Sequence, residues 1–298
     1  DGGQTWRNYV TPIAAYTYGI DFVQNNIWLG SNGSKILRST DYGINWEWQK
    51  SSALFNSVGW KDNLNGWISA GSNVGTDGYC FKTTDGGLSW FQDFDSPGGK
   101  EIFFLDDQIG WMLWEGNSSS VWQTLDGGAN WTQHYIGSGG AWIGDIFFIS
   151  PDSGWACGSN GMLRFTSNGG ASWVTQSSGV SDYISRVFFV NSLEGWIAGG
   201  YGGGNGFIRH TTNGGQNWLA QTPASSVHLQ DIFFINEFEG WASAVGGTIQ
   251  HTTDGGNSWL AVSSVPHDFA DKIYMVDSNN GWLLANNSQG NDGRGHIY

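Results

Sequence analysis

The chain has 298 residues, among them 47 glycines, 19 tryptophans and only 5 prolines. Its 12 basic and 26 acidic side chains give a formal net charge of −14. This charge argues against nucleic acid or an anionic membrane as a partner, because binding to a polyanion needs a basic footprint. No apolar run approaches the roughly 20 residues that insert across a bilayer. Abundant glycine, small polar and aromatic residues favour short strands and tight turns.

A turn motif of the form Thr-x-Asp/Asn-x-Gly-x-Ser/Thr/Asn-Trp opens the chain as a clipped copy and then recurs along it. An Asp or Asn in such a turn accepts backbone N–H bonds, and the glycines supply positive φ. We therefore interpret these acidic and amide residues as structural: Asp1, Asp41, Asp85, Asp126, Asn168, Asn213 and Asp254. The tryptophans that close the copies lie 40 to 45 residues apart, at positions 6, 46, 90, 131, 173, 218 and 259.

A second motif runs in phase with the first. An apolar strand leads into a short polar turn, and Gly-Trp then opens another apolar strand. Clear copies occupy residues 102–114, 146–158, 187–199 and 232–244, and looser copies centre on Trp28, Trp67 and Trp282. Fourteen of the 19 tryptophans thus fill two fixed positions per repeat, which identifies them as part of the architecture.

Each repeat predicts four strands, and a four-stranded unit of this length is the size of a propeller blade. The sequence therefore predicts an all-β chain, a seven-bladed β-propeller with four antiparallel strands per blade. The chain begins with a fourth strand and ends, over residues 295–298, with a third one. We expect pairing of the N- and C-terminal strands in one blade to close a single domain over residues 1–298.

The two motifs together resemble those of the Asp-box (BNR) propellers, which belong to the wider class of WD40/YVTN-like repeat folds. Within them, the combination of IFF-type strands, Gly-Trp and TTDGG-x-Ser-Trp is most similar to the photosystem II assembly and stability factors and their bacterial secreted relatives. This resemblance implies a binding or assembly role. Similar boxes also occur in sialidases, xyloglucan-cleaving propellers and sortilin-type receptors, so the fold alone does not determine the function.

Charged residues are predicted where the first strand of each blade meets the mouth of the central channel. Counting ten residues back from the Gly-Trp tryptophans gives three carboxylates and two cations, Glu101, Asp145, Asp231, Arg186 and Lys272, besides Ser57; the first blade has a shorter turn, which places Gly19 there. Such a cluster can shift pKa values and supply a general acid and base. The alternative interpretation is a set of ion pairs between blades around a solvated channel.

Aromatic residues outside the two repeat positions fall in segments predicted as long loops on the same face. They are Trp114, Trp122, Trp142, Tyr135 and Tyr201, with Tyr79 beside them. Exposed rings on a rigid scaffold suit sugar stacking or a protein interface. The alternative is that many of these rings fill the cores of the blades.

No cofactor or metal site is predicted. His210 and His251 occupy equivalent positions in neighbouring repeats but lack further clustered ligands, and Cys80 and Cys157 lie in separate repeats without metal-like spacing. These observations favour a non-enzymatic, extracytoplasmic scaffold, secreted, periplasmic or on the cell surface, that binds a protein partner through its loop-rich face. The alternative is a glycoside hydrolase or glycan-binding lectin that uses the carboxylates at the channel mouth. Because the sequence opens inside a motif, we also expect it to be a module of a longer surface or secreted protein.

Overall fold

The computed structural model describes twelve segments of the chain: residues 1–10, 17–23, 26–31, 35–51, 55–71, 78–93, 99–114, 120–137, 142–201, 204–266, 269–286 and 295–298. In these residues it is a seven-bladed β-propeller of four-stranded antiparallel sheets, with one short 3-10 helix at Ser159–Gly161. The predicted fold is confirmed. The chain divides into two compact units, one formed by Asp1–Asn8, Ala141–Gln289 and Ile297–Tyr298, the other by Tyr9–Gly140 and Gly290–His296. The extent of a single domain over residues 1–298 stays a prediction.

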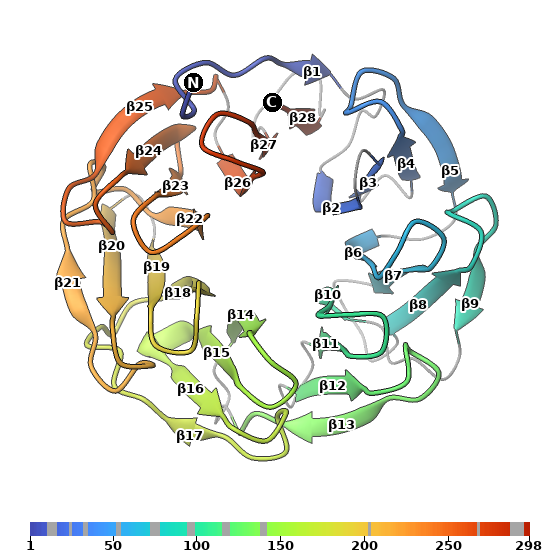
Figure 1. Ribbon diagram of the computed structural model, residues 1–298, viewed down its shortest axis with the longest axis horizontal. Helices are drawn as coiled ribbons and strands as arrows, with labels where there is room; N and C mark the ends of the chain where they lie inside the picture. The colour runs from blue at the N-terminus through green and yellow to red at the C-terminus, as the bar shows by residue number, and fades with distance from the viewer. Residues whose placement is uncertain are drawn as a thin grey trace. The chain divides into compact units, whose positions relative to one another are not determined.

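Unit one contains three complete sheets in which the strands follow one another in chain order (Figure 1). Their strands are β14 (Ile143–Phe148), β15 (Gly154–Gly158), β16 (Leu163–Thr166) and β17 (Val174–Thr175); β18 (Ile184–Phe189), β19 (Gly195–Tyr201), β20 (Gly204–Thr211) and β21 (Leu219–Gln221); and β22 (Leu229–Phe234), β23 (Gly240–Ala244), β24 (Thr248–Thr252) and β25 (Leu260–Ser264). β26 (Phe269–Met275) and β27 (Gly281–Asn286) follow in the chain.

Unit two contains the three other complete sheets, also in chain order. They consist of β2 (Thr17–Val23), β3 (Asn26–Ser31), β4 (Lys35–Ser39) and β5 (Glu47–Ser51); β6 (Phe55–Trp60), β7 (Gly66–Gly71), β8 (Gly78–Thr83) and β9 (Phe91–Asp93); and β10 (Glu101–Phe104), β11 (Gly110–Trp114), β12 (Ser120–Thr124) and β13 (Thr132–Tyr135).

The seventh sheet combines the two ends of the chain. Its order is β1–β28–β27–β26, where β1 is Tyr9–Val10 and β28 is Gly295–Ile297. The N-terminal strand therefore takes the fourth place in the last blade, as the motif positions predict. Among the described residues no helix is long and apolar enough to cross a membrane.

The Asp boxes fold through hydrogen bonds that span only a few residues. In the copy at Asp85, Oδ1 accepts a bond from the Ser89 amide at 2.9 Å and from Thr83 Oγ1 at 2.8 Å, and the Ser89 hydroxyl donates to Oδ2. The Thr83 hydroxyl in turn accepts the Gly87 amide at 2.9 Å. Gly86 and Gly87 have φ of 75° and 90°, a conformation that costs glycine little. The structural interpretation of Asp85 follows directly from this geometry.

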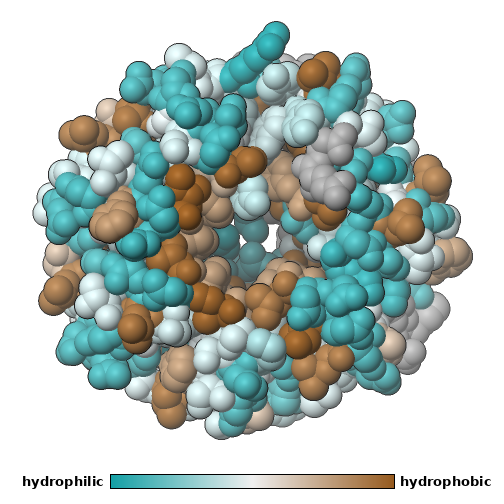
Figure 2. Space-filling model, in the orientation of Figure 1, coloured by the Kyte–Doolittle hydropathy of each residue, from teal (hydrophilic) through white to brown (hydrophobic). Residues whose placement is uncertain are grey.

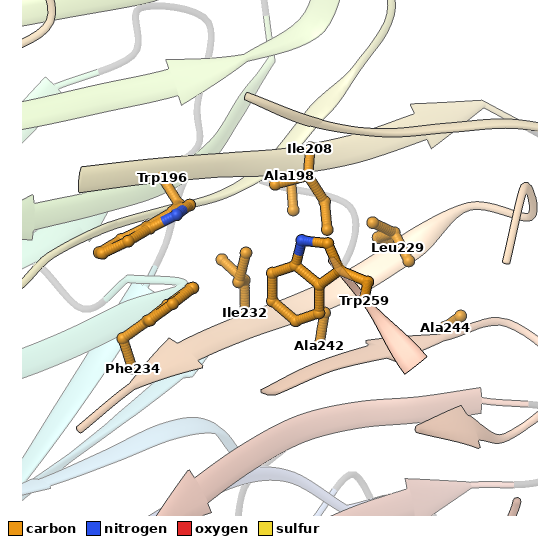
Figure 3. Close-up of a cluster of buried hydrophobic side chains, with 9 residues drawn as sticks. All are labelled: Trp196, Ala198, Ile208, Leu229, Ile232, Phe234, Ala242, Ala244 and Trp259. Atoms are coloured by element: carbon orange, nitrogen blue, oxygen red, sulfur yellow. The ribbon is translucent and has the colours of Figure 1, made fainter. Parts of the chain in front are cut away.

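Tryptophan–phenylalanine stacks form the core between adjacent sheets. The Trp196 indole of β19 lies flat against the Phe234 ring of β22, with ring centroids 3.6 Å apart, and the box tryptophan Trp259 meets Phe234 edge-on at 5.8 Å (Figure 3). The same stack joins Trp155 to Phe189 at 3.6 Å. In unit two, Trp60 takes the place of the phenylalanine and stacks on Trp28 at 3.8 Å. These aromatic pairs thus link one blade to the next, and Met275 takes the equivalent place in β26, in the cluster of Trp241.

The first strands of the unit-one sheets begin two or three residues earlier than the sequence predicts. Asp145, Arg186, Asp231 and Lys272 are each the third or fourth residue of a strand, and the pairing register with the second strand shifts just before them. Such a bulge places one extra residue in the strand and redirects its side chain. The extra residues are Gly144, Ser185, Gln230 and Asp271. A sequence pattern of period two does not reveal this insertion.

Candidate functional site

Arg186 joins two buried carboxylates from the sheets on either side of its own. Its Nη1 donates to Asp145 Oδ1 at 3.0 Å, and its Nε donates to Asp231 Oδ1 at 2.7 Å. The side chains of Asp145 and Asp231 are 4% and 3% exposed, and that of Arg186 is 24% exposed. The structure therefore brings together three of the five charged residues that the sequence places at the channel mouth.

Each of these two carboxylates also binds the backbone of the next first strand. Asp145 Oδ2 accepts the Val187 amide of β18 at 3.0 Å, and Asp231 Oδ2 accepts the Ile273 amide of β26 at 2.8 Å. Both oxygens of both carboxylates are thus engaged, which leaves neither group poised for proton transfer to a substrate. The geometry corresponds to the ion pairs between blades, and it gives no support to hydrolysis by this pair of carboxylates.

A second row of polar side chains comes from the bulge residues. Ser185 Oγ and His228 Nε2 share a hydrogen bond of 2.7 Å, and the His228 ring meets the Tyr183 ring edge-on. In the next two sheets, Gln230 Nε2 donates to Asp271 Oδ1 at 3.4 Å, and Asn286 Nδ2 donates to Asp271 Oδ2 at 2.6 Å. We call Ser185, His228, Gln230, Asp271 and Asn286 the polar row.

Two members of the polar row titrate away from their ordinary range. Burial raises the pKa of Asp271 to about 6, a change that the hydrogen bond from Asn286 and the charge of Lys272 only partly oppose. Burial likewise lowers the pKa of His228. Perturbed groups gathered at one place are a common mark of a functional site. The polar row is therefore the strongest candidate that unit one offers at this end of its strands.

The other two predicted charged residues are Lys272 and Glu101. Lys272 directly follows Asp271, and its positive charge acts on that carboxyl. Glu101 is the partly buried first residue of β10, in unit two.

The predicted aromatic binding residues separate into exposed and buried groups. Trp142 and Tyr201 in unit one are 75% and 78% exposed, and Tyr135 at the end of β13 is 62% exposed. Trp114 ends β11 and is half-buried. The loop position predicted for Trp122 is wrong, because Trp122 lies within β12 and packs against the core cluster around Trp67. Tyr79 lies in β8, and nothing further is described of its side chain.

Trp142 and Tyr201 lie at the same end of the unit-one strands as the polar row. The Ser159 amide, just after β15, donates to the Trp142 carbonyl at 2.9 Å, so Trp142 lies beside the end of that second strand. Tyr201 is the last residue of β19, whose Gly200 amide donates to the Tyr183 carbonyl before β18. In antiparallel pairs, the start of one strand meets the end of the next. Exposed rings and polar row thus share one end of the sheets.

The histidines and cysteines have structural surroundings. His210 Nε2 lies 2.5 Å from Glu194 Oε1, and its ring stacks on Trp196, while His251 repeats the arrangement with Glu239 and Trp241. Both cysteines are buried. Within the twelve described segments, no group of three or more His, Cys, Asp or Glu side chains could hold a metal ion.

Sequence reasoning missed Ser185, His228, Gln230, Asp271 and Asn286 as candidate residues. The sequence does carry one indication of them. In successive repeats, a polar residue comes immediately before the residue predicted at the channel mouth. Ser185, Gln230 and Asp271 each have this place. His228 and Asn286 carry no such signal, since only the contacts between strands bring them to Ser185 and Asp271.

The chain is similar to known propellers in part of its sequence and in its fold. Residues 139–222 match the family model described as photosynthesis system II assembly factor YCF48. A solved structure of YCF48 bound to D1 peptide is 23% identical, covers 98% of this chain and 96% of its own, and has a TM-score of 0.76. YCF48 from Cyanidioschyzon merolae is 19% identical over 98% of each chain, with a TM-score of 0.79.

A xyloglucanase of the GH74 class from Xanthomonas campestris shares the fold at lower identity. It is 11% identical, with a TM-score of 0.69, over 95% of this chain and 54% of that chain. No protein of curated function matches the sequence significantly. The predicted resemblance to Asp-box propellers of the photosystem II assembly factor type is confirmed, as a likeness of fold along the chain and of sequence over residues 139–222.

Proposed function

We propose that this chain is a non-enzymatic binding scaffold that recognises a protein partner at the end of the unit-one sheets where the first strands begin. The observation that carries the proposal is the exposure of Trp142 and Tyr201 beside the polar row. Large aromatic side chains with little conformational freedom are favoured anchors in protein interfaces. The partly exposed Ser185, His228 and Gln230 add hydrogen-bonding groups at the same end of the sheets.

The Arg186 network supports binding rather than chemistry at this end. Asp145 and Asp231 each accept bonds from Arg186 and from a backbone amide. These bonds join the first strands of neighbouring sheets, and a preorganised support lowers the entropic cost of ordering an interface. The proposed function is thus to bind a partner through a surface that is already formed before binding.

The similar solved proteins support a peptide as the partner. One of them is YCF48 bound to D1 peptide, so a propeller of this fold can bind a peptide. An extracytoplasmic location, secreted, periplasmic or at the cell surface, is part of the proposal and is supported by the acidic, lysine-poor composition. It can be tested by fractionating cells that express the natural gene and probing each fraction with an antibody.

The binding proposal is tested by placing a photo-crosslinking amino acid at position 142 or 201 and irradiating the protein in extracts of its source cells. The matched control is position 88, where Leu88 of an Asp box is 74% exposed. A defined protein adduct from positions 142 and 201, absent from position 88, supports the proposal. Adducts of the same kind from all three positions contradict it.

A panel of polysaccharides separates this proposal from the glycan alternative. Release of new reducing ends by the purified chain overturns the non-enzymatic scaffold in favour of a hydrolase. Retention without release, abolished by Trp142→Ala, overturns the protein partner in favour of a lectin.

A further inference from the structure

A second surface of unit one, at the opposite end of the first strands, is not used by the function proposed above. The second-to-last residue of each first strand there is aromatic: Phe147, Phe188, Phe233 and Tyr274. Neighbouring rings contact one another in tilted pairs with centroids 5.1 to 5.2 Å apart. The three phenylalanines are half-buried, and Tyr274 is 41% exposed. We call these four residues the aromatic row.

The turns that follow the aromatic row extend its apolar character. Leu193, Phe238 and Val276 are 57%, 59% and 64% exposed, and they lie in the turns after β18, β22 and β26. Figure 2 shows hydrophobic side chains gathered around β14, β18 and β22 on the face that it displays. Exposed apolar groups gathered in this way, rather than scattered singly, mark interaction sites.

The same turns are acidic. Those after β14, β18, β22 and β26 span residues 149–153, 190–194, 235–239 and 276–280, and they contain no lysine or arginine. Their acidic residues are Asp152, Glu194, Glu237, Glu239 and Asp277. Glu194 and Glu239 are paired with His210 and His251, whereas Asp152, Glu237 and Asp277 have exposed side chains.

We propose that the aromatic row and the three turn residues Leu193, Phe238 and Val276 form a docking surface for a basic segment of a partner protein that carries apolar side chains between its lysines or arginines. The apolar side chains of such a segment pack on the rings, and its cations face the carboxylates of the turns. Complementary charge selects this partner over an acidic one and over a second copy of the chain, which carries a net charge of −14.

The repeat geometry favours a segment that runs across the sheets. The turns of β18 and β22 present the same pair, an exposed apolar residue followed by glutamate, at Leu193–Glu194 and Phe238–Glu239. The Gly214 and Gly255 amides of the adjacent Asp boxes donate to the Leu193 and Phe238 carbonyls at 2.9 and 2.8 Å and so hold both turns in one conformation. Equivalent pairs of an apolar and an acidic side chain on successive repeats suit a partner with alternating side-chain chemistry.

The test uses a fluorescein-labelled peptide of alternating lysine and leucine, with lysine–serine and glutamate–leucine peptides as matched probes, read by fluorescence anisotropy at physiological salt. We expect the lysine–leucine peptide to bind and both matched probes to bind at least roughly tenfold more weakly. Equal binding of the lysine–serine peptide would overturn the proposal, because charge alone would then account for the affinity.

Variants locate the binding on the chain. Leu193→Ser combined with Phe238→Ser is expected to weaken binding of the lysine–leucine peptide by at least about tenfold. The control combines Leu219→Ser with Leu260→Ser, which lie on the fourth strands β21 and β25 of the same sheets and are 66% and 68% exposed. It should change binding by less than about twofold. Equal weakening by both pairs would show nonspecific adsorption and overturn the proposal.

Two further measurements complete the test. Glu237→Gln should weaken binding more than Asp182→Asn, a loss of the same charge at the other end of the strands; the reverse order would contradict the proposed contact. Sedimentation velocity would overturn the proposal if the wild type dimerises and the Leu193→Ser, Phe238→Ser variant is monomeric, since a second copy would then be the occupant. Near-ultraviolet circular dichroism of the tryptophans verifies that each variant is folded.

Discussion

The indole of Trp196 lies parallel to the ring of Phe234 from the adjacent sheet, with 9° between the two planes. Trp196 also donates its Nε1 hydrogen to the Gly255 carbonyl in an Asp box at 3.2 Å. One side chain therefore joins its own sheet, the first strand of the next sheet, and the turn motif of that next sheet. The two sequence motifs, which recur in phase along the chain, meet physically at this residue.

Truncation of Trp196 should strongly destabilise the fold. Trp196→Ala removes a fully buried ring and leaves a cavity between two sheets, so we expect a loss of roughly 3–5 kcal/mol in the free energy of unfolding. Guanidinium denaturation followed by far-ultraviolet circular dichroism measures this loss. Trp142→Ala, which truncates an indole that is 75% exposed, is the control and should change stability by no more than about 0.5 kcal/mol. Similar losses in the two variants would contradict the stacking role.

We expect removal of Arg186 alone to cost more stability than removal of Arg186 together with the charges of its two carboxylate partners. Arg186→Met leaves Asp145 and Asp231 buried without their shared cation, and we expect it to cost about 3–5 kcal/mol. Adding Asp145→Asn and Asp231→Asn removes both uncompensated charges and should recover a large part of that loss. Thermal and chemical unfolding of the single and triple variants measure the difference. A triple variant less stable than Arg186→Met would show that the carboxylates matter chiefly through their bonds to backbone amides.

We expect the contribution of Asp271 to the free energy of unfolding to fall as the pH rises. Its pKa is about 6 in the folded chain and about 4 when unfolded, so between these values the folded state binds more protons. Stability from this group is present below about pH 4 and is lost as pH rises through 6. Asp271→Asn does not titrate, so its stability relative to wild type should increase by on the order of 2–3 kcal/mol between pH 4 and pH 7. Urea denaturation across this range measures the change, and a pH-independent difference would refute the raised pKa.

We expect the aspartate of an Asp box to be replaceable by asparagine, but not by alanine, without a large loss of stability. Asn168 already makes the same turn, accepting the Ser172 amide and the Thr166 hydroxyl at 2.9 Å each. Asp85→Asn should therefore change stability at neutral pH by less than about 1 kcal/mol, whereas Asp85→Ala leaves amides unpaired and should cost about 1–3 kcal/mol. The hydrogen bonds from Ser89 hold the pKa of Asp85 at about 2. Differential scanning calorimetry of the two variants checks the order, which equal losses would contradict.

Tyr42 occupies the position of Gly86 in its own Asp box and has a φ of 58°. A side chain in this left-handed conformation costs roughly 1–2 kcal/mol. Tyr42→Gly removes that cost but makes the unfolded chain more flexible by about 0.4–1 kcal/mol, so we expect a net gain in stability of about 1 kcal/mol or less. Gly86→Ala is the reciprocal control and should be destabilising. A loss of stability in Tyr42→Gly would mean that the exposed Tyr42 ring makes stabilising contacts.

The Asp boxes and the Gly-Trp strands could be predicted from sequence because their contacts are local or strictly repeated. The bonds of Asp85 stay within its own turn, to Thr83 and Ser89, so a short motif contains all the information needed. The pairing of the terminal strands followed from the phase of the repeats. The role of Trp60 could not be predicted in this way. Only the structure shows that Trp60 takes the place of the stacking phenylalanine and packs on the tryptophan of the preceding sheet.

The candidate site was predictable only in part. The count back from Gly-Trp placed Asp145, Arg186 and Asp231 together because the repeat length is nearly constant. It could not place the polar row, because the repeat pattern reveals neither the bulge that holds Ser185 nor the contact of Ser185 with His228, which lies outside the counted position. Trp122 illustrates the opposite error: an aromatic residue near a long loop was predicted to be exposed, yet strand pairing with Gln133 holds it inside a sheet.

The bulge in the first strands provides a position at which the residue can differ between blades. A residue inserted between two ladder positions does not set the pairing register, so its replacement leaves the hydrophobic side chains of the strand on their proper faces. Gly144, Ser185, Gln230 and Asp271 already differ in size, charge and hydrogen-bonding capacity while sharing one backbone position. Recognition can therefore be rewritten at Ser185, Gln230 and Asp271 without any change to the tryptophan stacks on which the fold depends, whereas a Cβ at Gly144 would lie 2.3 Å from the Ile184 carbonyl oxygen.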